Sequence, residues 1–180
     1  KDVAGYCSEE QEGLVSINED GKFVVVTDPL DGSSNIEANV SIGTIFSIFP
    51  INGLKVQETI FQQGNKQACS GFFVYGPRTT LFLTFKKGTH SFYLNYNSNQ
   101  FELLQKDILI SESTTEYSIN TSYKRFWNKK VLNYIQNCQE GVNGPRKKDF
   151  NMRWVGSLVA DASRIFSRGG IFLYPEDTRE

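Results

Sequence analysis

The chain has 180 residues, of which 39% are hydrophobic and 22% are charged, and its formal net charge is -1. A chain of this length can bury a substantial core, and this composition is typical of a globular protein rather than a disordered or membrane-spanning one. Proteins that bind nucleic acid usually carry clustered positive charge. We therefore expect neither a nucleic-acid partner nor a membrane partner.

Cysteine and histidine are scarce, which limits the kinds of site that the chain can build. Cys7, Cys69 and Cys138 are widely spaced and form no CxxC pair, so they indicate neither a disulfide framework nor a zinc site. His90 lies in the turn-like sequence KKGTHS and is the one histidine, which excludes two-histidine sites and disfavours a Ser/His/Asp triad. We expect a reducing compartment, the cytoplasm.

Three stretches of the chain have the pattern of β-strands. Residues 22–28 (KFVVVTD) are mostly apolar and β-branched, which predicts a strand buried on both faces. Residues 40–50 predict a second strand, closed by Pro50. Residues 79–106 contain three strand-like runs, separated by turn residues around Gly88 and 97–99, which is typical of an antiparallel meander.

Two stretches have helical periodicity. The first covers about residues 128–137, with Asn128 as the expected N-cap. The second is VGSLVADASRIFSRGG, where Ser157 lies in the first turn and Gly169–Gly170 end the helix. Its apolar stripe consists of Val155, Leu158, Val159, Ala162, Ile165 and Phe166. Strands interleaved with helices predict a layered α/β or α+β protein with mixed sheets and packed helices.

Two acids stand three residues apart in the segment TDPLDGSSNI at 27–36. We expect Asp28 to end the strand and Asp31 to follow within one turn, so that both carboxylates project from one rigid corner. Two ionised carboxylates about 4 Å apart repel by roughly 4 kcal/mol at an effective dielectric near 20. A cation is needed between them, and Mg²⁺ suits because it is usually held by one or two carboxylates together with substrate phosphate.

The residues around this acidic pair are suited to phosphate chemistry. Gly32 allows close approach of the backbone, and the sequence SSN that follows favours a helix start with free amides, which bind phosphate. Upstream, Glu9 and Glu10 can supply a further metal ligand and a base that polarises an attacking water, whose pKa the metal would lower. The combined pattern indicates a metal-assisted phosphate site.

Simpler interpretations are open for each motif taken alone. A DPxDG sequence is often a strand-end turn with Asx hydrogen bonds, and the pair Glu9–Glu10 is often a solvated acidic pair. A calcium loop of the EF-hand type is disfavoured, because Pro29 is misplaced and the twelfth position is Asn39 instead of glutamate.

Longer blocks of the sequence resemble class I fructose-1,6-bisphosphatase, within the metal-dependent, lithium-sensitive phosphatases that include inositol monophosphatases. Five blocks occur in the family's order: DPLDGSSNIEANVSIGTIFSI (28–48), QQGNKQACSGFFVYGPRTTL (62–81), EYSIN (116–120), RWVGSLVADASR (153–164) and GGIFLYP (169–175). The resemblance implies the layered α+β sandwich of the sugar phosphatases. It also implies that residues 1–180 are the central part of such a catalytic domain, without the family's N-terminal helical region and C-terminal part.

The resemblance implies a site for two or more Mg²⁺ ions, for which Mn²⁺ or Zn²⁺ can substitute. The implied ligands are Glu9, Asp28, the backbone carbonyl of Leu30, and Asp31. Glu9 and Glu10 are the implied catalytic residues, with Glu10 orienting or deprotonating the nucleophilic water. The implied cradle for the 1-phosphate consists of Gly32, Ser33 and Ser34.

The resemblance also implies a pocket for the 6-phosphate of the sugar. Its residues are Asn120, Tyr123, Arg153, Trp154 and Tyr174. In the family the arginine reaches across from a neighbouring subunit, and a homotetramer is implied. The family usually has tyrosine at the position of Trp154, and commonly Asn-Glu-Gly where this chain has INTSY. Asn35 and Asp161 would fix the sugar or the loops, and Lys22 matches a basic residue of the AMP site in some members.

The implied activity is Mg²⁺-dependent hydrolysis of the 1-phosphate of fructose 1,6-bisphosphate, giving fructose 6-phosphate and phosphate, in gluconeogenesis. Sedoheptulose-1,7-bisphosphatase or a related sugar or inositol phosphatase is the alternative within the enzyme class. A non-catalytic module that binds phosphate or supports oligomerisation is the alternative of another class. For a chain without the family's two ends we expect impaired metal binding and little or no turnover.

Overall fold

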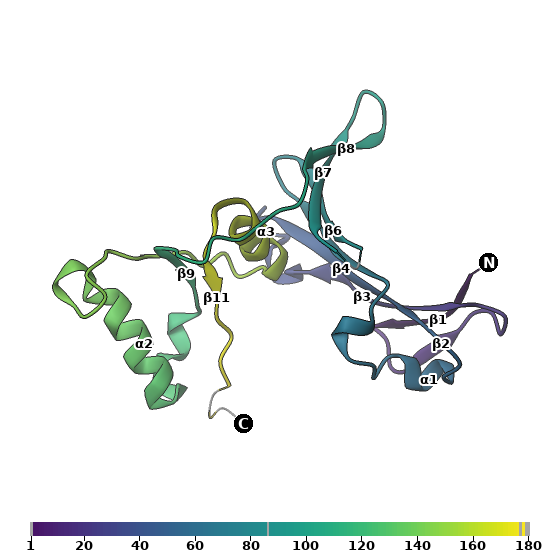
Figure 1. Cartoon of the computed structure of the whole chain (residues 1–180), viewed down its shortest axis with the longest axis horizontal. Coiled ribbons are helices and arrows are strands. Elements are labelled where there is room, and N and C mark those ends of the chain that lie inside the picture. Colours follow the sequence, from purple (N-terminus) through teal and green to yellow (C-terminus); the bar gives the residue numbers. More distant parts are fainter. Residues whose placement is uncertain (1, 86, 177, 179–180) are drawn as a thin grey trace. The chain divides into compact units, whose positions relative to one another are not determined.

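The computed structural model describes residues 2–85, 87–176 and 178. The chain folds as two compact units, unit 1 (Lys1–Ile108) and unit 2 (Leu109–Glu180), and each unit is built on a sheet of its own (Figure 1). Sheets combined with packed helices confirm the predicted α/β class. Among the described residues, the helices are too short or too polar to cross a membrane.

Unit 1 contains, within its described residues, an eight-stranded sheet with the order β2-β1-β3-β4-β5-β6-β7-β8. The strands are β1 (Val3–Ser8), β2 (Leu14–Ser16), β3 (Phe23–Asp31), β4 (Ile42–Pro50), β5 (Cys69–Tyr75), β6 (Thr79–Thr84), β7 (Thr89–Asn95) and β8 (Gln100–Gln105). β1 runs parallel to β3, whereas the other neighbouring strands are antiparallel. The connections contain helix α1 (Val56–Thr59) and 3-10 turns at Ser33–Asn35 and Gly64–Lys66.

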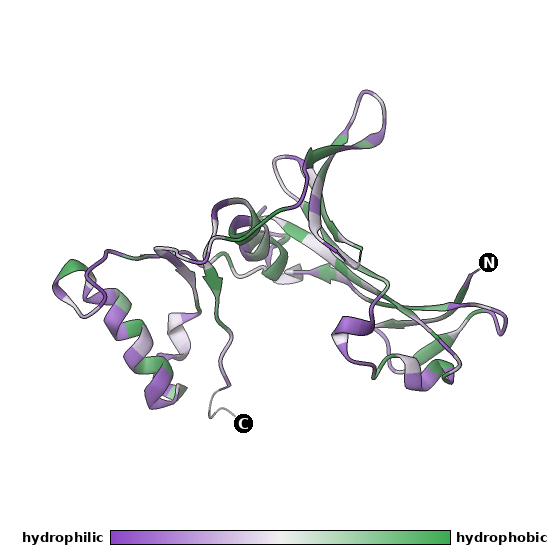
Figure 2. Cartoon of the chain, in the orientation of Figure 1, coloured by the Kyte–Doolittle hydropathy of each residue, from purple (hydrophilic) through white to green (hydrophobic). Residues whose placement is uncertain are grey.

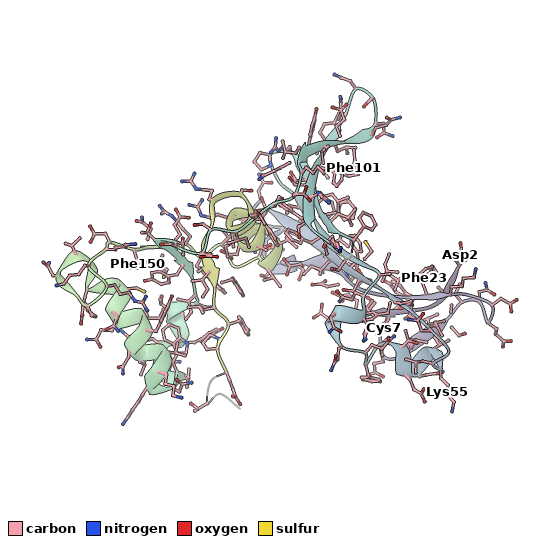
Figure 3. The ribbon with its side chains drawn as sticks, in the orientation of Figure 1. Asp2, Cys7, Phe23, Lys55, Phe101 and Phe150 are labelled. Carbon is pink, nitrogen blue, oxygen red and sulfur yellow. The ribbon has the colours of Figure 1, made fainter. Side chains whose placement is uncertain are left out.

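The strand predictions for unit 1 are mostly confirmed. The meander predicted for 79–106 is present as β6, β7 and β8, with Phe101 on its last strand (Figure 3). The strand predicted at 40–50 begins two residues late, at Ile42, and ends at Pro50. The turn predicted around Gly88 is present, with Gly88 in the left-handed conformation (φ 74°), but His90 lies on β7, which begins at residue 89, and not in the turn.

The strand predicted at 22–28 differs from the structure in two respects. Asp28 does not end it, because β3 continues to Asp31. The prediction that it is buried on both faces is wrong as well: Val24 is fully buried, but the other residues of β3 are partly exposed. Because the side chains of a strand alternate between the two faces of the sheet, partial exposure at successive positions means that neither face of β3 is completely covered.

Unit 2 contains, in its described part, a three-stranded parallel sheet with the order β10-β9-β11. Its elements are β9 (Glu116–Ser118), a 3-10 helix at Thr121–Phe126, α2 (Lys129–Gln139), a 3-10 turn at Gly141–Asn143, β10 (Asn151–Met152), α3 (Leu158–Arg168) and β11 (Ile171–Phe172). Ile135 and Cys138 of α2 pack in a core with Tyr117 of β9. α3 contacts the next residue, Ser118, whose hydroxyl donates a hydrogen bond to the carboxylate of Asp161. Because successive strand residues face opposite sides, α2 and α3 cover opposite faces of the sheet.

The two predicted helices are present. α2 begins after Asn128, whose Oδ1 accepts hydrogen bonds from the amides of Lys130 and Val131 at 3.0 and 3.1 Å, as an N-cap should. Figure 2 shows hydrophobic and hydrophilic residues alternating along α2, in keeping with its single buried face. α3 starts later than predicted, at Leu158: Ser157, expected in the first turn, is the N-cap, and Val155 lies ahead of the helix and outside the apolar stripe.

Replacing the N-cap of α2 tests how much this end of the helix contributes to stability. We expect Asn128→Ala to lower the free energy of unfolding by about 1 kcal/mol, because two amides of the first turn lose their acceptor. Urea denaturation followed by circular dichroism measures the change. Asn133→Ala is the matched control, since Asn133 is exposed in the middle of α2 and alanine is a good helix former there. An equal loss in both variants would contradict the capping role.

Two buried thiols make stability depend on alkaline pH. Burial raises the pKa of the Cys69 thiol above its ordinary value of 9.0. Burial also raises the pKa of the Cys138 thiol, and this effect is larger than the lowering by nearby Arg146. Unfolded thiols therefore ionise first, so the stabilisation is complete below pH 9 and is lost as the pH rises through the folded-state pKa. We expect the free energy of unfolding to fall as the pH rises above 9, and Cys138→Ala to make that fall shallower. An unchanged slope in the variant would refute the assignment to this thiol.

Candidate functional site

Two parallel strands of unit 1 end side by side and carry acids where they end. Ser8, the last residue of β1, is in register with Thr27 of β3. The amide of Glu9 donates to the carbonyl oxygen of Thr27 at 3.1 Å, so the position of Glu9 lies beside that of Asp28. The carboxyl ends of parallel strands are the places where open α/β sheets bind ligands. The parallel pairing thus brings together two acids that are far apart in the sequence.

A β-bulge places the carboxylates of Asp28 and Asp31 on one face of the sheet. Asp28 lies opposite Ile45 of β4, and Asp31 lies opposite Gly43, so three steps along β3 match two along β4. In a regular strand, residues three apart would face opposite sides. Positions 43 and 45 share a face, and residues directly opposite one another in a ladder also share a face. The carboxylates therefore project together, from a bulged strand and not from the turn that we expected.

Hydrogen bonds hold the bulge in place. Pro29 has no amide to donate to the ladder, and its carbonyl oxygen accepts from the Thr44 hydroxyl at 2.8 Å. The same hydroxyl is 2.8 Å from the hydroxyl of Tyr75 on the next strand. One carboxylate oxygen of Asp28 accepts from the amide of Leu30 at 3.0 Å, which fixes the side chain. Its second oxygen is left for a cation.

The segment after the bulge turns its backbone toward solvent. Gly32 has a φ of 78°, a left-handed conformation that glycine adopts without steric cost, and a three-residue 3-10 turn follows. Within the turn, the amides of Asn35 and Ile36 donate to carbonyls at 2.8 and 3.2 Å. The amides of Ser33 and Ser34 have no acceptor in the part of the chain that the structure describes, and both residues are exposed. The helix expected here is only this short turn, but its free amides are in the predicted place.

The oxygen donors of unit 1 fit a hard cation, although they do not enclose one. Glu9 and Glu10 are exposed, and Asp28 and Asp31 are partly buried. In the residues described, no three acidic, histidine or cysteine side chains are close enough together to hold a metal ion. Mg²⁺ is commonly bound by one or two carboxylates, with water and phosphate completing its shell. The paired carboxylates, together with the carbonyl of Leu30, match that requirement in kind.

Unit 2 places the residues predicted for the second phosphate at the carboxyl edge of its sheet. Asn120, Trp154 and Tyr174 each stand two residues beyond the end of β9, β10 and β11, respectively. The chain leaves β9 toward β10 on one side and then crosses to β11 on the other side. β9 and β11 therefore flank a topological switch point, which is where such sheets bind ligands.

A cavity of about 500 Å³ lies at this edge. Its lining consists of Asn120, Tyr123, Trp154, Gly156, Ser157, Leu158, Asp161, Phe172 and Tyr174. Four of the five residues predicted for the 6-phosphate thus come together. The fifth, Arg153, is exposed and lines a different, small cavity beside Glu116 and Arg164. Arg153 therefore precedes Trp154 in the sequence but does not line the cavity that Trp154 lines.

Aromatic rings and one amide give the cavity its chemical character. The rings of Trp154 and Phe172 stack with centroids 5.8 Å apart, and Phe172 stacks on Tyr174 at 6.5 Å. Asn120 accepts the amide of Ser122 with its Oδ1 at 3.1 Å, which leaves its NH₂ group to donate to a ligand. Phe172 was not among the predicted site residues. It lies two residues before Tyr174 on an extended segment, and this spacing predicts that the two side chains share a face.

Asp161, at the first turn of α3, ties the segment after β10 in place. Its side chain is 1% exposed and accepts hydrogen bonds from the amides of Val155 and Gly156, at 3.2 Å each, and from the Ser118 hydroxyl at 2.8 Å. Gly156 has a φ of +85°, a conformation that disfavours other residues. A buried carboxylate thus fixes the loop that carries Trp154, in line with the role predicted for it.

The remaining predicted residues lie outside these two arrangements. Lys22 is exposed and immediately precedes β3, where its amide donates to the carbonyl of Asp2 at 2.7 Å. Its assignment to an AMP site stays a prediction. Asn35 is partly buried and forms the last residue of the turn after Gly32.

Comparison with known proteins settles which family has this arrangement. The model of the fructose-1,6-bisphosphatase N-terminal domain matches residues 1–106, and that of the C-terminal domain matches residues 110–180. The chain belongs to the fructose-1,6-bisphosphatase family. The border between the two matches falls close to the border between unit 1 and unit 2.

Named relatives and solved structures agree with this family. Class 1 fructose-1,6-bisphosphatases of Azorhizobium caulinodans and Xanthobacter autotrophicus are 49% and 47% identical over 181 residues, which is 99% of this chain and 55% of each relative. A crystal structure of Leishmania major fructose-1,6-bisphosphatase in the T-state matches 98% of this chain and 57% of its own, with 32% identity and a TM-score of 0.90. The holo form of that protein gives a TM-score of 0.88. The chain spans about half the length of the curated relatives it matches.

Replacing Asp161 tests its role in holding the loop. Asp161→Asn keeps the size of the side chain but presents an NH₂ group to donors, so we expect a loss of roughly 2–3 kcal/mol in the free energy of unfolding. We also expect faster hydrogen exchange at the amides of Val155 and Gly156, measured by NMR. Asp149→Asn is the matched control, because Asp149 is exposed and accepts a single amide, that of Val142, at 3.1 Å. Unaltered exchange at residues 155 and 156 would rule out this role.

Proposed function

We propose that this chain carries the catalytic carboxylates and the sugar-phosphate cavity of a Mg²⁺-dependent fructose-1,6-bisphosphatase, which hydrolyses the 1-phosphate of fructose 1,6-bisphosphate in the cytoplasm. The relatives that bear this name support the proposal. The observation that supports the proposal most strongly is the bulge of β3, which puts Asp28 and Asp31 on one face of the sheet. The position of Glu9 lies beside that of Asp28. A cation between these acids would relieve their mutual repulsion.

The 1-phosphate would be bound between the carboxylates and the turn that follows them. Glu9, Asp28, Asp31 and the Leu30 carbonyl would hold Mg²⁺. Bound there, Mg²⁺ supplies positive charge that offsets both the acids and the phosphate. The free amides of Ser33 and Ser34 would donate to phosphate oxygens, as amides at the start of a turn do.

Glu10 would act on the water that attacks the phosphorus. It is exposed, and its amide is fixed by the hydroxyl of Ser8 at 3.3 Å, so its carboxylate is free to accept a proton. As the water oxygen bonds to phosphorus, the bond between phosphorus and the sugar oxygen would break. Glu10 would take a proton from the water and return it to that sugar oxygen, which gives phosphate and the sugar alcohol as products. No covalent phosphoenzyme is required.

The cavity of unit 2 would hold the second phosphate and the sugar. The NH₂ group of Asn120 and the hydroxyls of Tyr123 and Tyr174 are donors suited to phosphate oxygens. The indole of Trp154 can donate but not accept, so it too suits an anion. We propose that Arg153, exposed and outside this cavity, serves the cavity of a neighbouring copy in a homotetramer.

A phosphate-release assay with Mg²⁺ on the full-length protein tests the activity, because we expect little or no turnover from residues 1–180 alone. We expect release from fructose 1,6-bisphosphate, and far less from fructose 6-phosphate and inositol monophosphate, because the cavity in unit 2 requires a second phosphate. Mn²⁺ and Zn²⁺ in place of Mg²⁺ define the metal preference. Equal rates on the three substrates would contradict the proposed specificity. Faster release from sedoheptulose 1,7-bisphosphate would indicate that the longer sugar is the substrate instead.

A charge-removing variant tests the acidic cluster. We expect Asp28→Asn to lower the Mg²⁺-dependent rate at least a hundredfold, or about 2.7 kcal/mol, because the cation loses a ligand. Asp20→Asn is the control: Asp20 lies in an exposed turn, where its amide donates to Asn18. Calorimetric titration with Mg²⁺ on both variants separates lost metal binding from lost chemistry. Metal-independent phosphate binding that Asp28→Asn leaves intact would favour a non-catalytic module.

A further inference from the structure

Unit 2 has a second large cavity, at the opposite edge of its sheet from the cavity described above. Its volume is about 480 Å³, within the range of small-molecule sites. Glu116 and Tyr117 of β9, and Gly170 and Ile171 at the start of β11, place it at the amino-terminal edge. β9 has three residues, and strands rise about 3.3 Å per residue, so the two edges are about 10 Å apart. The two cavities are therefore distinct.

Arg146 projects its guanidinium into the wall of this cavity and is held there by two aromatic rings. Its Cζ lies 4.4 Å from the ring centroid of Tyr134, on α2, and 5.8 Å from that of Phe150. Phe150 lies in the segment that leads from α2 to β10 (Figure 3). Stacking on aromatic faces fixes the plane of a guanidinium and leaves its edge to donate hydrogen bonds.

The guanidinium has no partner for its donors. Among the residues that the structure describes, Arg146 donates no hydrogen bond and forms no ion pair, and its Nε is buried without an acceptor. Arg125 is also stacked on a ring, that of Phe126, yet it donates to the carbonyl of Ser122. A buried donor without an acceptor is costly, and an anion in this cavity would offer the guanidinium acceptors that the described residues do not supply.

The charges around the cavity favour an anionic ligand. Of its two acids, Glu116 is already neutralised, because both its oxygens accept from Arg164 at 2.9 and 3.0 Å. Lys148 adds a second cation to Arg146, against the single remaining acid, Glu112. The hydroxyl-bearing residues Ser111, Ser113 and Thr114 complete a polar rim.

We propose that this cavity is a binding site for a small organic anion, a carboxylate or a phosphate ester, which the guanidinium fork of Arg146 grips with two hydrogen bonds while Lys148 adds charge. Carboxylates and phosphates both offer two oxygens that a guanidinium can bind with two parallel hydrogen bonds. The site is built from unit 2 alone, so it does not depend on the proposed phosphatase activity.

NMR titration of the whole chain with two probes, inorganic phosphate and succinate, tests the site at low salt. We expect at least one probe to shift the amides of residues 111–116 and 146–150. Phosphate alone assigns phosphate chemistry, succinate alone assigns carboxylate chemistry, and both assign the shared chemistry. Absence of shifts at these residues with either probe overturns the proposal, and so do shifts confined to residues 32–35.

Variants of Arg146 tie the binding to its fork. Arg146→Met keeps much of the side-chain volume and should weaken binding at least tenfold, the equivalent of losing one charge-assisted hydrogen bond. Arg146→Lys keeps the charge and the fold but loses the fork, and should weaken binding to a smaller degree. Arg125→Met, which removes a stacked arginine elsewhere, should leave binding unchanged. Unaltered affinity in the well-folded Arg146→Lys and Arg146→Met proteins refutes the role of the fork.

Discussion

The mutual repulsion of carboxylates is the constraint on which the candidate site of unit 1 depends. Asp28 and Asp31 share one face only because β3 carries an extra residue between them, and Glu9 joins them only because β1 runs parallel to β3. A regular strand, or an antiparallel neighbour, would have separated these charges and made the sheet more stable by itself. Hydrogen bonds through Thr44 and Tyr75 hold the bulge against that alternative. The fold therefore keeps a charge cluster whose repulsion a cation can relieve.

Parallel pairing serves the same purpose in both units. Unit 1 is antiparallel apart from one pair, and that pair is the one that ends in acids. In the described part of unit 2 both strand pairs are parallel, and residues predicted for the second phosphate follow the ends of the three strands. Antiparallel strands would have sent these ends to opposite edges of the sheet. Very short strands suffice, since β10 and β11 need only to deliver Trp154 and Tyr174 to the edge at which β9 delivers Asn120.

Local patterns in the sequence predicted the elements that local chemistry determines, and failed where tertiary pairing decides. Asn128 before an amphipathic run predicted the start of α2, since an N-cap acts within its own turn. β1, which brings Glu9 to the site, has no strong periodicity, and no strand was predicted there. Asp28 looked like the end of a strand because Pro29 usually interrupts a ladder. The bulge that accommodates Pro29 depends on Thr44, fifteen residues away, and no local pattern reports it. The resemblance to a family, by contrast, gave site residues that the cavity of unit 2 brings together.

The short sheet of unit 2 has one cavity at each end of its strands, and β9 contributes residues near both. At its carboxyl end, Ser118 helps Asp161 to fix the loop of Trp154, so the acid there is fully satisfied by donors. At its amino end, Glu116 is satisfied by Arg164, but Arg146 is not satisfied by any group that the structure describes. The Nε of Arg164 is also buried without an acceptor, but the Nη2 of Arg164 donates to Glu116, whereas Arg146 donates to no described residue. Aromatic stacking keeps the guanidinium in place instead, at the cost of an open pair of donors. That combination stabilises the geometry of a cation while leaving its hydrogen bonds for a ligand, which is the arrangement of a binding site and not of a core.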